Sequence, residues 1–281
     1  MTYWNHIYAN FDPVAFSIFS LKVHWYGIMY VLALLAALMM AKWIVTKDKL
    51  DMDKKILDDY FIWIEVGVIL GARLGYILFY DPNTMYYISH PWQIFNPFNQ
   101  EGDFVGIRGM SYHGALIGFL LGSYLFARKN SYSFWYLMDI VAIAVPLGYI
   151  FGRIGNFLNQ ELIGRVTEVP WGIYVNGVLR HPSQLYEAFL EGIVVFAIIY
   201  LIRRKVPFAG GLTLGYGALY GLARFTAEFW RAPDEQIGYI MGWMTQGQLL
   251  SLPMIFISLI GLYWLSKQKF PRVLMRKDSK K

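Results

Sequence analysis

The sequence predicts an all-α integral membrane protein with about seven transmembrane helices. Of its 281 residues, 57% are hydrophobic and only 16% are charged, which is typical of membrane proteins and unusual for soluble domains. Several apolar stretches approach the roughly 20 residues that a membrane span needs. Lysines and arginines gather in alternate loops between these stretches. We therefore expect residues 1–281 to form a single polytopic membrane domain.

The expected spans follow one another along the whole chain. Their approximate ranges are 24–45, 59–80, 110–128, 134–154, 184–202, 209–229 and 244–266. Ser111 lies at the start of the third span and Ser183 just before the fifth, and serine is a favoured N-cap because its hydroxyl accepts a bond from a first-turn amide. In the fourth span, Gly148, Gly152 and Gly155 would allow a neighbouring helix to approach closely.

Basic residues indicate which connections face the cytoplasm. The connections after the first, third and fifth spans and the C-terminal tail are basic: Lys47, Lys49, Lys54 and Lys55, then Arg128 and Lys129, then "RRK" at 203–205, then "KQKFPRVLMRKDSKK". By the positive-inside rule these four regions are cytoplasmic. The N-terminus would then lie outside and the C-terminus inside. The first 16 residues lack the basic and apolar regions of a cleavable signal peptide.

The three remaining connections are expected outside the cytoplasm. They cover about 81–109, about 155–183 and the segment containing "RAPDEQIG". In the second, β-branched and aromatic residues flank Pro170 and the turn signal "VNGV", a pattern typical of a β-hairpin. We expect residues 155–183 to form a small extracytoplasmic head between spans four and five.

Composition also excludes several classes of protein. The net charge of +6 does not indicate nucleic-acid binding, because the basic residues lie in short loops and not in one patch. The chain has no cysteine, which excludes disulfides, thiolate metal sites and a cysteine nucleophile. Its five histidines lack the H-E-x-x-H spacing of a zinc protease, and no G-x-S-x-G motif indicates a serine hydrolase.

Ionisable residues inside the expected spans mark a candidate site. A charged side chain at the bilayer centre costs about 2.5–3.5 kcal/mol on insertion scales, so such residues are functional candidates. They are Glu65, Arg73, Asp139, Arg153, Arg224 and Glu228. Any one of them could instead reach the membrane surface or join an interhelical ion pair. Their gathering toward the outer half favours a common site.

The sixth span carries a polar stripe. Tyr220, Arg224, Glu228 and Arg231 follow at spacings of four, four and three, which places them on one face if the helix continues. Two arginines and one carboxylate would leave this stripe positively charged. Guanidinium groups bind phosphate in a bidentate manner, so the stripe suits an anionic group. The alternative is an Arg-Glu-Arg ladder whose members only satisfy one another.

The stretch "GRIGNFLNQELIG" at 152–164 places an arginine and several amides where the fourth span should end. If the helix continues, Arg153, Asn156 and Gln160 share one face and Glu161 lies beside them. These groups could donate to a phosphate or an acyl carbonyl, or could merely hydrate a helix end.

His113 lies in the first turn of the third span, near the outer membrane surface. A histidine there could act as a general acid or base. A lone histidine can equally be a hydrogen-bonded structural residue.

Four motifs carry a family resemblance. "HGALIG", "GRIGNFLNQELIG", "RHPSQLYEA" and "RFTAEFWRAPDEQ" occur in this order at successive outer helix ends. Together they resemble the prolipoprotein diacylglyceryl transferase family of bacterial inner membranes, and the similarity extends to "HWYGIMY" and "GARLGY". One minor departure is Ala115, where the family commonly has glycine.

The resemblance implies a reaction and its participants. The diacylglyceryl group of phosphatidylglycerol would pass to the thiol of the lipobox cysteine in a prolipoprotein signal peptide, forming a thioether and releasing glycerol 1-phosphate. The resemblance implies no cofactor, no metal and no nucleic-acid partner, and places the protein among membrane lipids in the bacterial cell membrane. It assigns importance to Tyr26, His113, Arg153, Asn156, Glu161, Gly164, Tyr220, Arg224 and Glu228, and we expect Arg231 of the polar stripe to join the lipid site.

The residues suit this chemistry. We expect Arg153 and Arg224 to hold the phosphate as its charge develops, and Asn156 and Glu161 to position the head group or Arg153. His113 is the leading candidate for the base, although a thiol of pKa about 8.5 near several guanidiniums could ionise with little help. Two alternatives are a transporter or flippase for anionic lipids and an assembly factor that only binds signal peptides.

Overall fold

The computed structural model describes residues 2–19, 21–50, 52–98, 102, 106–107, 109–233 and 238–268. They divide into two compact units, one within residues 1–50 and 138–273 and one within residues 51–137. Part of the connection "NPFNQEGDF", residues 234–237 of the third outer connection and the tail from residue 269 lie outside the described residues.

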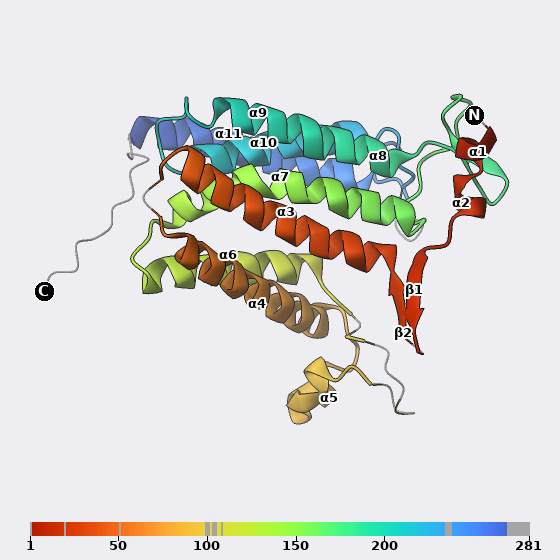
Figure 1. The fold of residues 1–281 in the computed structure, drawn as a ribbon, viewed down its shortest axis with the longest axis horizontal. Helices are drawn as coiled ribbons and strands as arrows, with labels where there is room; N and C mark the ends of the chain where they lie inside the picture. Colours follow the sequence, from red (N-terminus) through yellow and green to blue (C-terminus); the bar gives the residue numbers. More distant parts are fainter. Residues whose placement is uncertain are drawn as a thin grey trace, which may run out of the picture. The chain divides into compact units, whose positions relative to one another are not determined.

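The first unit is built around long helices that run side by side (Figure 1). They are α3 (Trp25–Lys47), α7 (Phe134–Leu158), α10 (Gly211–Ala227), α11 (Gln246–Gln268), and a continuous helix made of α8 (Ser183–Glu187), the π-helical η2 (Ala188–Val194) and α9 (Val195–Ile202). Their core includes Ile44, Ile143, Ile199 and Leu212, each from a different helix. Burying apolar side chains from four helices together holds the unit around its polar interior.

Asp139 of α7 has a structural role in this unit. Its carboxylate accepts hydrogen bonds from the backbone amides of Gly210 and Thr213 at 3.0 and 2.9 Å, and from the Thr213 hydroxyl at 2.8 Å. These amides belong to the start of α10, where helical partners are missing. Asp139 therefore caps a neighbouring helix, which is a structural role different from the ion pair or surface position considered for this residue.

The second unit contains a close pair of helices, α4 (Lys54–Phe79) and α6 (Tyr112–Lys129). The chain between them forms the short helix α5 (Thr84–Ser89) and the 3-10 helix η1 (Pro91–Phe95). A Cβ added to Gly71 would lie 2.3 Å from the Gly114 carbonyl oxygen, so the two backbones touch where both helices carry glycine. Arg73 of α4 donates to the carbonyl oxygens of Ile94 and Gly109 at 2.5 and 3.2 Å. This buried arginine therefore anchors the connection between α4 and α6.

The hairpin expected at "VNGV" is confirmed. Strands β3 (Ile173–Val175) and β4 (Val178–Arg180) pair antiparallel across it. The N-terminal helices α1 (Thr2–Asn5) and α2 (Ile7–Asn10) join the same region, because the Asn5 amide donates to the Gly172 carbonyl at 2.7 Å and Tyr8 packs with Phe157 and Ile173. A second hairpin, β1 (Val14–Ile18) and β2 (Leu21–His24), then leads into α3.

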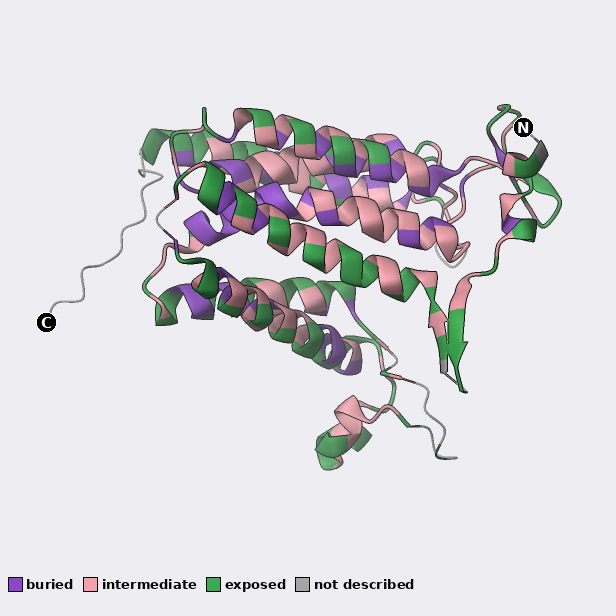
Figure 2. Cartoon of the chain, in the orientation of Figure 1, coloured by how far each residue is buried: buried purple, intermediate pink, exposed green. Residues whose placement is uncertain are grey.

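The structure confirms that the chain has membrane-spanning character, whereas the number of seven spans stays a prediction. Among the described residues, five helices are long and apolar enough to cross a membrane: α3, α4, α7, Ser183–Ile202 and α11. Helices α6 and α10, of 18 and 17 residues, occupy the expected third and sixth spans but are not among these five. Exposed residues recur along α3 (Figure 2), and among them are the apolar Val31, Leu35 and Met39. Apolar exposure of this kind suits contact with lipid.

The two serine caps have opposite outcomes. Ser111 is the N-cap of α6, since its Oγ accepts from the Gly114 amide at 3.1 Å. The expectation for Ser183 is wrong, because Pro182 is the N-cap of α8 and Ser183 is its first helical residue. The Ser183 hydroxyl instead donates to the Leu162 carbonyl at 3.2 Å, which ties the helix to the preceding loop.

Candidate functional site

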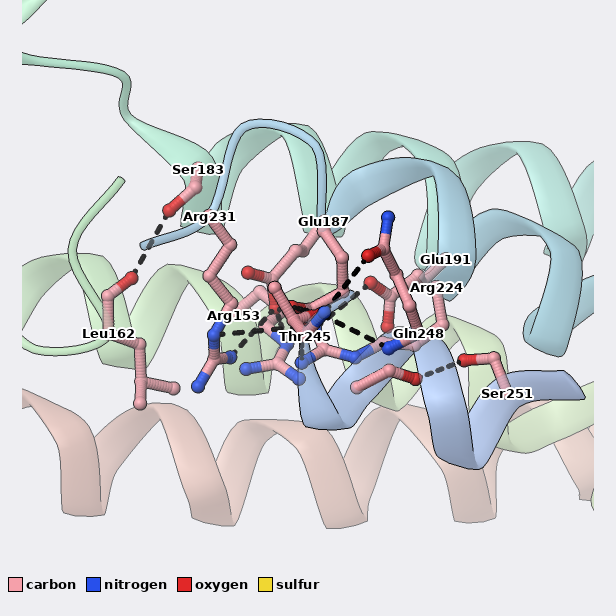
Figure 3. Close-up of polar contacts among 12 residues, drawn as sticks. Arg153, Leu162, Ser183, Glu187, Glu191, Arg224, Arg231, Thr245, Gln248 and Ser251 are labelled. Carbon is pink, nitrogen blue, oxygen red and sulfur yellow. Dashed lines mark hydrogen bonds and ion pairs between the residues drawn. The ribbon is translucent and has the colours of Figure 1, made fainter. Parts of the chain in front are cut away.

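Three arginines and three glutamates converge inside the first unit, and we refer to them as the Arg-Glu cluster (Figure 3). Its members are Arg153 of α7, Glu187 of α8, Glu191 of η2, Arg224 of α10, and Glu228 and Arg231 just after α10. The glutamates are buried: Glu187 and Glu191 expose no surface and Glu228 exposes 3%. Buried charges need partners, so the contacts within the cluster decide whether it is stable.

Glu187 is at the centre of these contacts. Its Oε2 lies 3.0 Å from Arg153 Nε, 2.9 Å from Arg224 Nη1 and 3.7 Å from Arg231 Nη1. One carboxylate oxygen thus draws together guanidiniums from α7, α10 and the segment after α10. Its other oxygen, Oε1, is buried and has no hydrogen-bond partner among the described residues.

Arg224 links the three carboxylates. Besides Glu187, its Nη1 lies 3.5 Å from Glu191 Oε1, and its Nη2 forms an ion pair with Glu228 Oε1. The Thr245 hydroxyl donates to Glu228 Oε2 at 2.7 Å. Thr245 and Gln248 also exchange reciprocal bonds, a capping box that begins α11 and holds this threonine in place.

A second hydrogen-bonded chain runs from Arg153 to the end of α7. Arg153 Nη1 donates to Asn156 Oδ1 at 3.2 Å, and Asn156 Nδ2 donates to Glu161 Oε1 at 2.6 Å. Asn156 therefore bridges Arg153 and Glu161, as "GRIGNFLNQELIG" suggested. The expectation for Gln160 is wrong, because α7 ends at Leu158 and Gln160 adopts a φ of 57°. Its amide turns away to the carbonyl oxygens of residues 8 and 11.

Two tyrosines, Tyr149 and Tyr220, lie beside the Arg-Glu cluster, and Tyr149 contacts Arg153 directly. Tyr149 Oη accepts from Arg153 Nε at 2.6 Å and donates to Glu191 Oε2, and its ring lies 4.8 Å from the Arg153 guanidinium carbon. Tyr220 Oη lies 3.4 Å from Tyr149 Oη. Tyr220, Arg224 and Glu228 thus do face one site.

Arg231 reaches the cluster by a different route from the expected one. Helix α10 ends at Ala227, so the helical stripe does not continue to Arg231, and this part of the prediction is wrong. Arg231 instead pairs through its backbone with Gly164 in an isolated antiparallel bridge. A Cβ on Gly164 would lie 2.1 Å from the His181 carbonyl oxygen, so only glycine fits between these strands. Gly164 therefore fixes the loop that returns Arg231 to the site.

The positive charge expected of the stripe is balanced in the assembled cluster by glutamates from another helix. Three arginines and three glutamates give a formal net charge of zero. The sequence reasoning overlooked Glu187 and Glu191, although two carboxylates four residues apart in an apolar span carry the same signal as Arg153 and Arg224. The cluster is thus more than an Arg-Glu-Arg ladder on one helix.

The remaining predicted residues lie elsewhere. Tyr26, at the start of α3, packs beside Gly155, whose added Cβ would lie 3.3 Å from Tyr26 Cδ2. It also lines a surface hollow of about 530 Å³ together with Asn159. His113 belongs to the second unit, where its Nδ1 lies 3.3 Å from Tyr80 Oη. The role of His113 as a base stays a prediction.

The fold and the site define a class: an integral membrane protein whose helices enclose a buried, hydrogen-bonded cluster of paired arginines and glutamates. The model of the prolipoprotein diacylglyceryl transferase family matches residues 13–264. The chain therefore belongs to this family, and the resemblance seen in the sequence is confirmed.

Similar proteins support the same assignment over nearly the full length. A Wolinella succinogenes protein is 67% identical over 271 residues, covering 96% of this chain and 99% of the relative. A Campylobacter jejuni protein is 65% identical, covering 92% and 96%. An Aliarcobacter butzleri protein is 59% identical, covering 94% and 96%. Each is named phosphatidylglycerol–prolipoprotein diacylglyceryl transferase.

Proposed function

We propose that this chain is a transferase that moves the diacylglyceryl group from phosphatidylglycerol to a prolipoprotein. The observation that carries the proposal is the convergence of Arg153, Arg224 and Arg231 in a buried cluster, within a chain closely similar to transferases of that name. A phosphodiester head group is the anion that a lipid substrate would present to such a cluster.

The proposed reaction is a displacement at the glyceryl C3 carbon of the lipid. The thiol sulfur of the lipobox cysteine forms a bond to this carbon, and the bond from the carbon to the phosphate oxygen breaks. The departing oxygen takes the electron pair, and glycerol 1-phosphate leaves. The thiol proton passes to a base, for which His113 is the proposed residue. No nucleophile from the enzyme and no cofactor enters this scheme.

The proposed roles follow from where the charge develops. Arg153 and Arg224 hold the phosphate, and their donors stabilise the charge that grows on the leaving oxygen. Asn156 and Glu161 orient Arg153 through the chain of hydrogen bonds described above. The lipid site is completed by Tyr26, Gly164, Tyr220, Glu228 and Arg231.

We further propose a seven-span arrangement in the bacterial inner membrane. In this arrangement α6 and α10 cross the membrane with the five longer helices, the N-terminus lies outside and the C-terminus lies in the cytoplasm. Residues 155–183 form an extracytoplasmic head within one polytopic domain. The alternating basic connections support this orientation.

The test is a reconstituted reaction with purified protein, phosphatidylglycerol vesicles and a lipobox peptide. Mass spectrometry should detect a diacylglyceryl adduct on the peptide cysteine, and a peptide with serine in place of cysteine is the control. Lipid movement between leaflets without an adduct would favour the transporter. Peptide binding without an adduct would favour the assembly factor.

A further inference from the structure

Glu187 holds a position in the Arg-Glu cluster that no other carboxylate shares. Its Oε2 contacts all three arginines, at 3.0, 2.9 and 3.7 Å. Glu191 pairs with Arg224, at 3.5 Å. Glu228 pairs with Arg224 and Arg231, the latter at 3.8 Å. Removing Glu187 would therefore leave three guanidiniums close together without their common partner.

The hydrogen bonding of the Glu187 carboxylate is incomplete. Its side chain is fully buried, and Oε1 has no hydrogen-bond partner among the described residues. The other glutamates of the cluster use both oxygens: Glu191 contacts Arg224 and Tyr149, and Glu228 contacts Arg224 and Thr245. A buried oxygen left unpaired destabilises a fold, so a carboxylate kept in this state indicates a role outside folding.

We infer that Glu187 is the internal counter-anion of the phosphate site: it holds the three guanidiniums converged before lipid arrives and lowers the affinity of the site for phosphate. This inference rests on the proposed function, because it takes the lipid phosphate as the ligand of Arg153 and Arg224.

Charge balance supplies the reason. With three arginines and three glutamates, the cluster is neutral before a phosphate enters it. An incoming phosphate competes with Glu187 for N–H donors of Arg153 and Arg224 and is repelled by its carboxylate. The same repulsion favours departure of glycerol 1-phosphate, which carries more charge than the diester. Glu187 is thus a positioning residue that limits binding so that product leaves.

The experiment compares wild type and Glu187→Gln with glycerol 1-phosphate as the probe, measured as an inhibitor of transfer. Glutamine keeps the size and one acceptor oxygen but removes the charge. We expect its inhibition constant for glycerol 1-phosphate to fall by about tenfold or more, since a like charge within a few ångströms has been removed. The KM for phosphatidylglycerol should fall with it, and kcat should fall because product release slows.

A comparison variant tests whether the position matters. Glu191→Gln removes the same charge four residues further along the helix, from a carboxylate that meets one arginine. We expect a smaller change in the inhibition constant than for Glu187→Gln. An equal or larger change would overturn the special role of Glu187, as would an unchanged or raised inhibition constant in Glu187→Gln.

If thermal unfolding in detergent shows that Glu187→Gln does not fold, a second substitution at the same position tests the inference. Glu187→Asp keeps the negative charge but moves it away from the arginines, because the aspartate side chain is shorter. The inhibition constant for glycerol 1-phosphate should therefore fall by a smaller factor than expected for Glu187→Gln. An inhibition constant at or above that of wild type would overturn the inference. Loss of the proposed function would look different. Wild type would then form no diacylglyceryl adduct on the lipobox peptide, whereas failure of the inference alone would leave wild-type transfer intact.

Discussion

Replacing Arg153 with lysine tests whether the function of this residue depends on its positive charge alone or also on the shape of its guanidinium group. The guanidinium reaches in two directions: Nε contacts Tyr149 Oη at 2.6 Å and Glu187 Oε2 at 3.0 Å, while Nη1 donates to Asn156 Oδ1 at 3.2 Å. The single ammonium of lysine keeps the positive charge but cannot make both sets of contacts. Asn156 would lose its donor, and with it the link from Arg153 to Glu161.

The expected loss can be worked from these contacts. One or two hydrogen bonds involving a charged group disappear, each contributing about 1.5–3 kcal/mol. If they hold Arg153 for the transition state, kcat/KM should fall by about 10- to 20,000-fold, since each 1.4 kcal/mol corresponds to tenfold. Arg153→Ala, which also removes the charge, should lose more.

The assay is phosphatidylglycerol-dependent transfer to a lipobox peptide, followed by the mass of the peptide. Arg203→Lys is the matched control, because Arg203 is also buried but binds Asp48 at 2.9 Å, beyond the opposite end of the continuous helix that begins near Glu187. Its transfer rate should stay near that of wild type. If the folded Arg153→Lys variant had the same kcat/KM as wild type, the proposal that the two-sided guanidinium group positions the phosphate would be refuted.

Three further outcomes are expected. Gly164→Ala should lower the free energy of unfolding by about 1–3 kcal/mol, because the alanine Cβ would lie 2.1 Å from the His181 carbonyl oxygen. An unchanged thermal midpoint of unfolding in detergent would contradict this contact. Burial acts to raise the pKa of Asp48, but hydrogen bonds from the two arginines that follow α9 outweigh it and hold that pKa below its ordinary value. The carboxylate therefore stabilises the fold above its ordinary pKa, and this stabilisation is lost as pH falls through the lowered folded value. Wild type should accordingly be more stable than Asp48→Asn at neutral pH, with the difference shrinking below about pH 4, and a pH-independent difference would count against the ion pairs. His113→Gln should slow transfer between pH 6 and 8 and alter its pH dependence, whereas wild-type rates across this range would exclude His113 as the base.

Local patterns in the sequence explain most of what could be predicted. The apolar runs located the long helices to within a few residues, because a span depends mainly on the composition of its own segment. The hairpin at "VNGV" likewise depends on a turn between adjacent strands. The polar residues Arg153, Asn156, Glu161 and Arg224 were found because charged and amide side chains are rare in apolar spans.

The predictions failed where a residue depends on distant parts of the chain. Gln160 leaves the face of α7 because its amide bonds to the N-terminal segment, about 150 residues earlier. Asp139 caps α10, whose N-cap residue Gly210 lies 71 residues later in the chain. No periodicity within one span could have shown either contact.

The sequence by itself determined the membrane class, the approximate helices, the family and most of the polar residues that meet in the cluster. Only the tertiary structure decided that Glu187 lies at the centre of three arginines and that the cluster is electrically balanced. The physical reason is that spacing along one helix fixes which side chains share its face, whereas the partners of a buried charge are chosen by how separate helices pack.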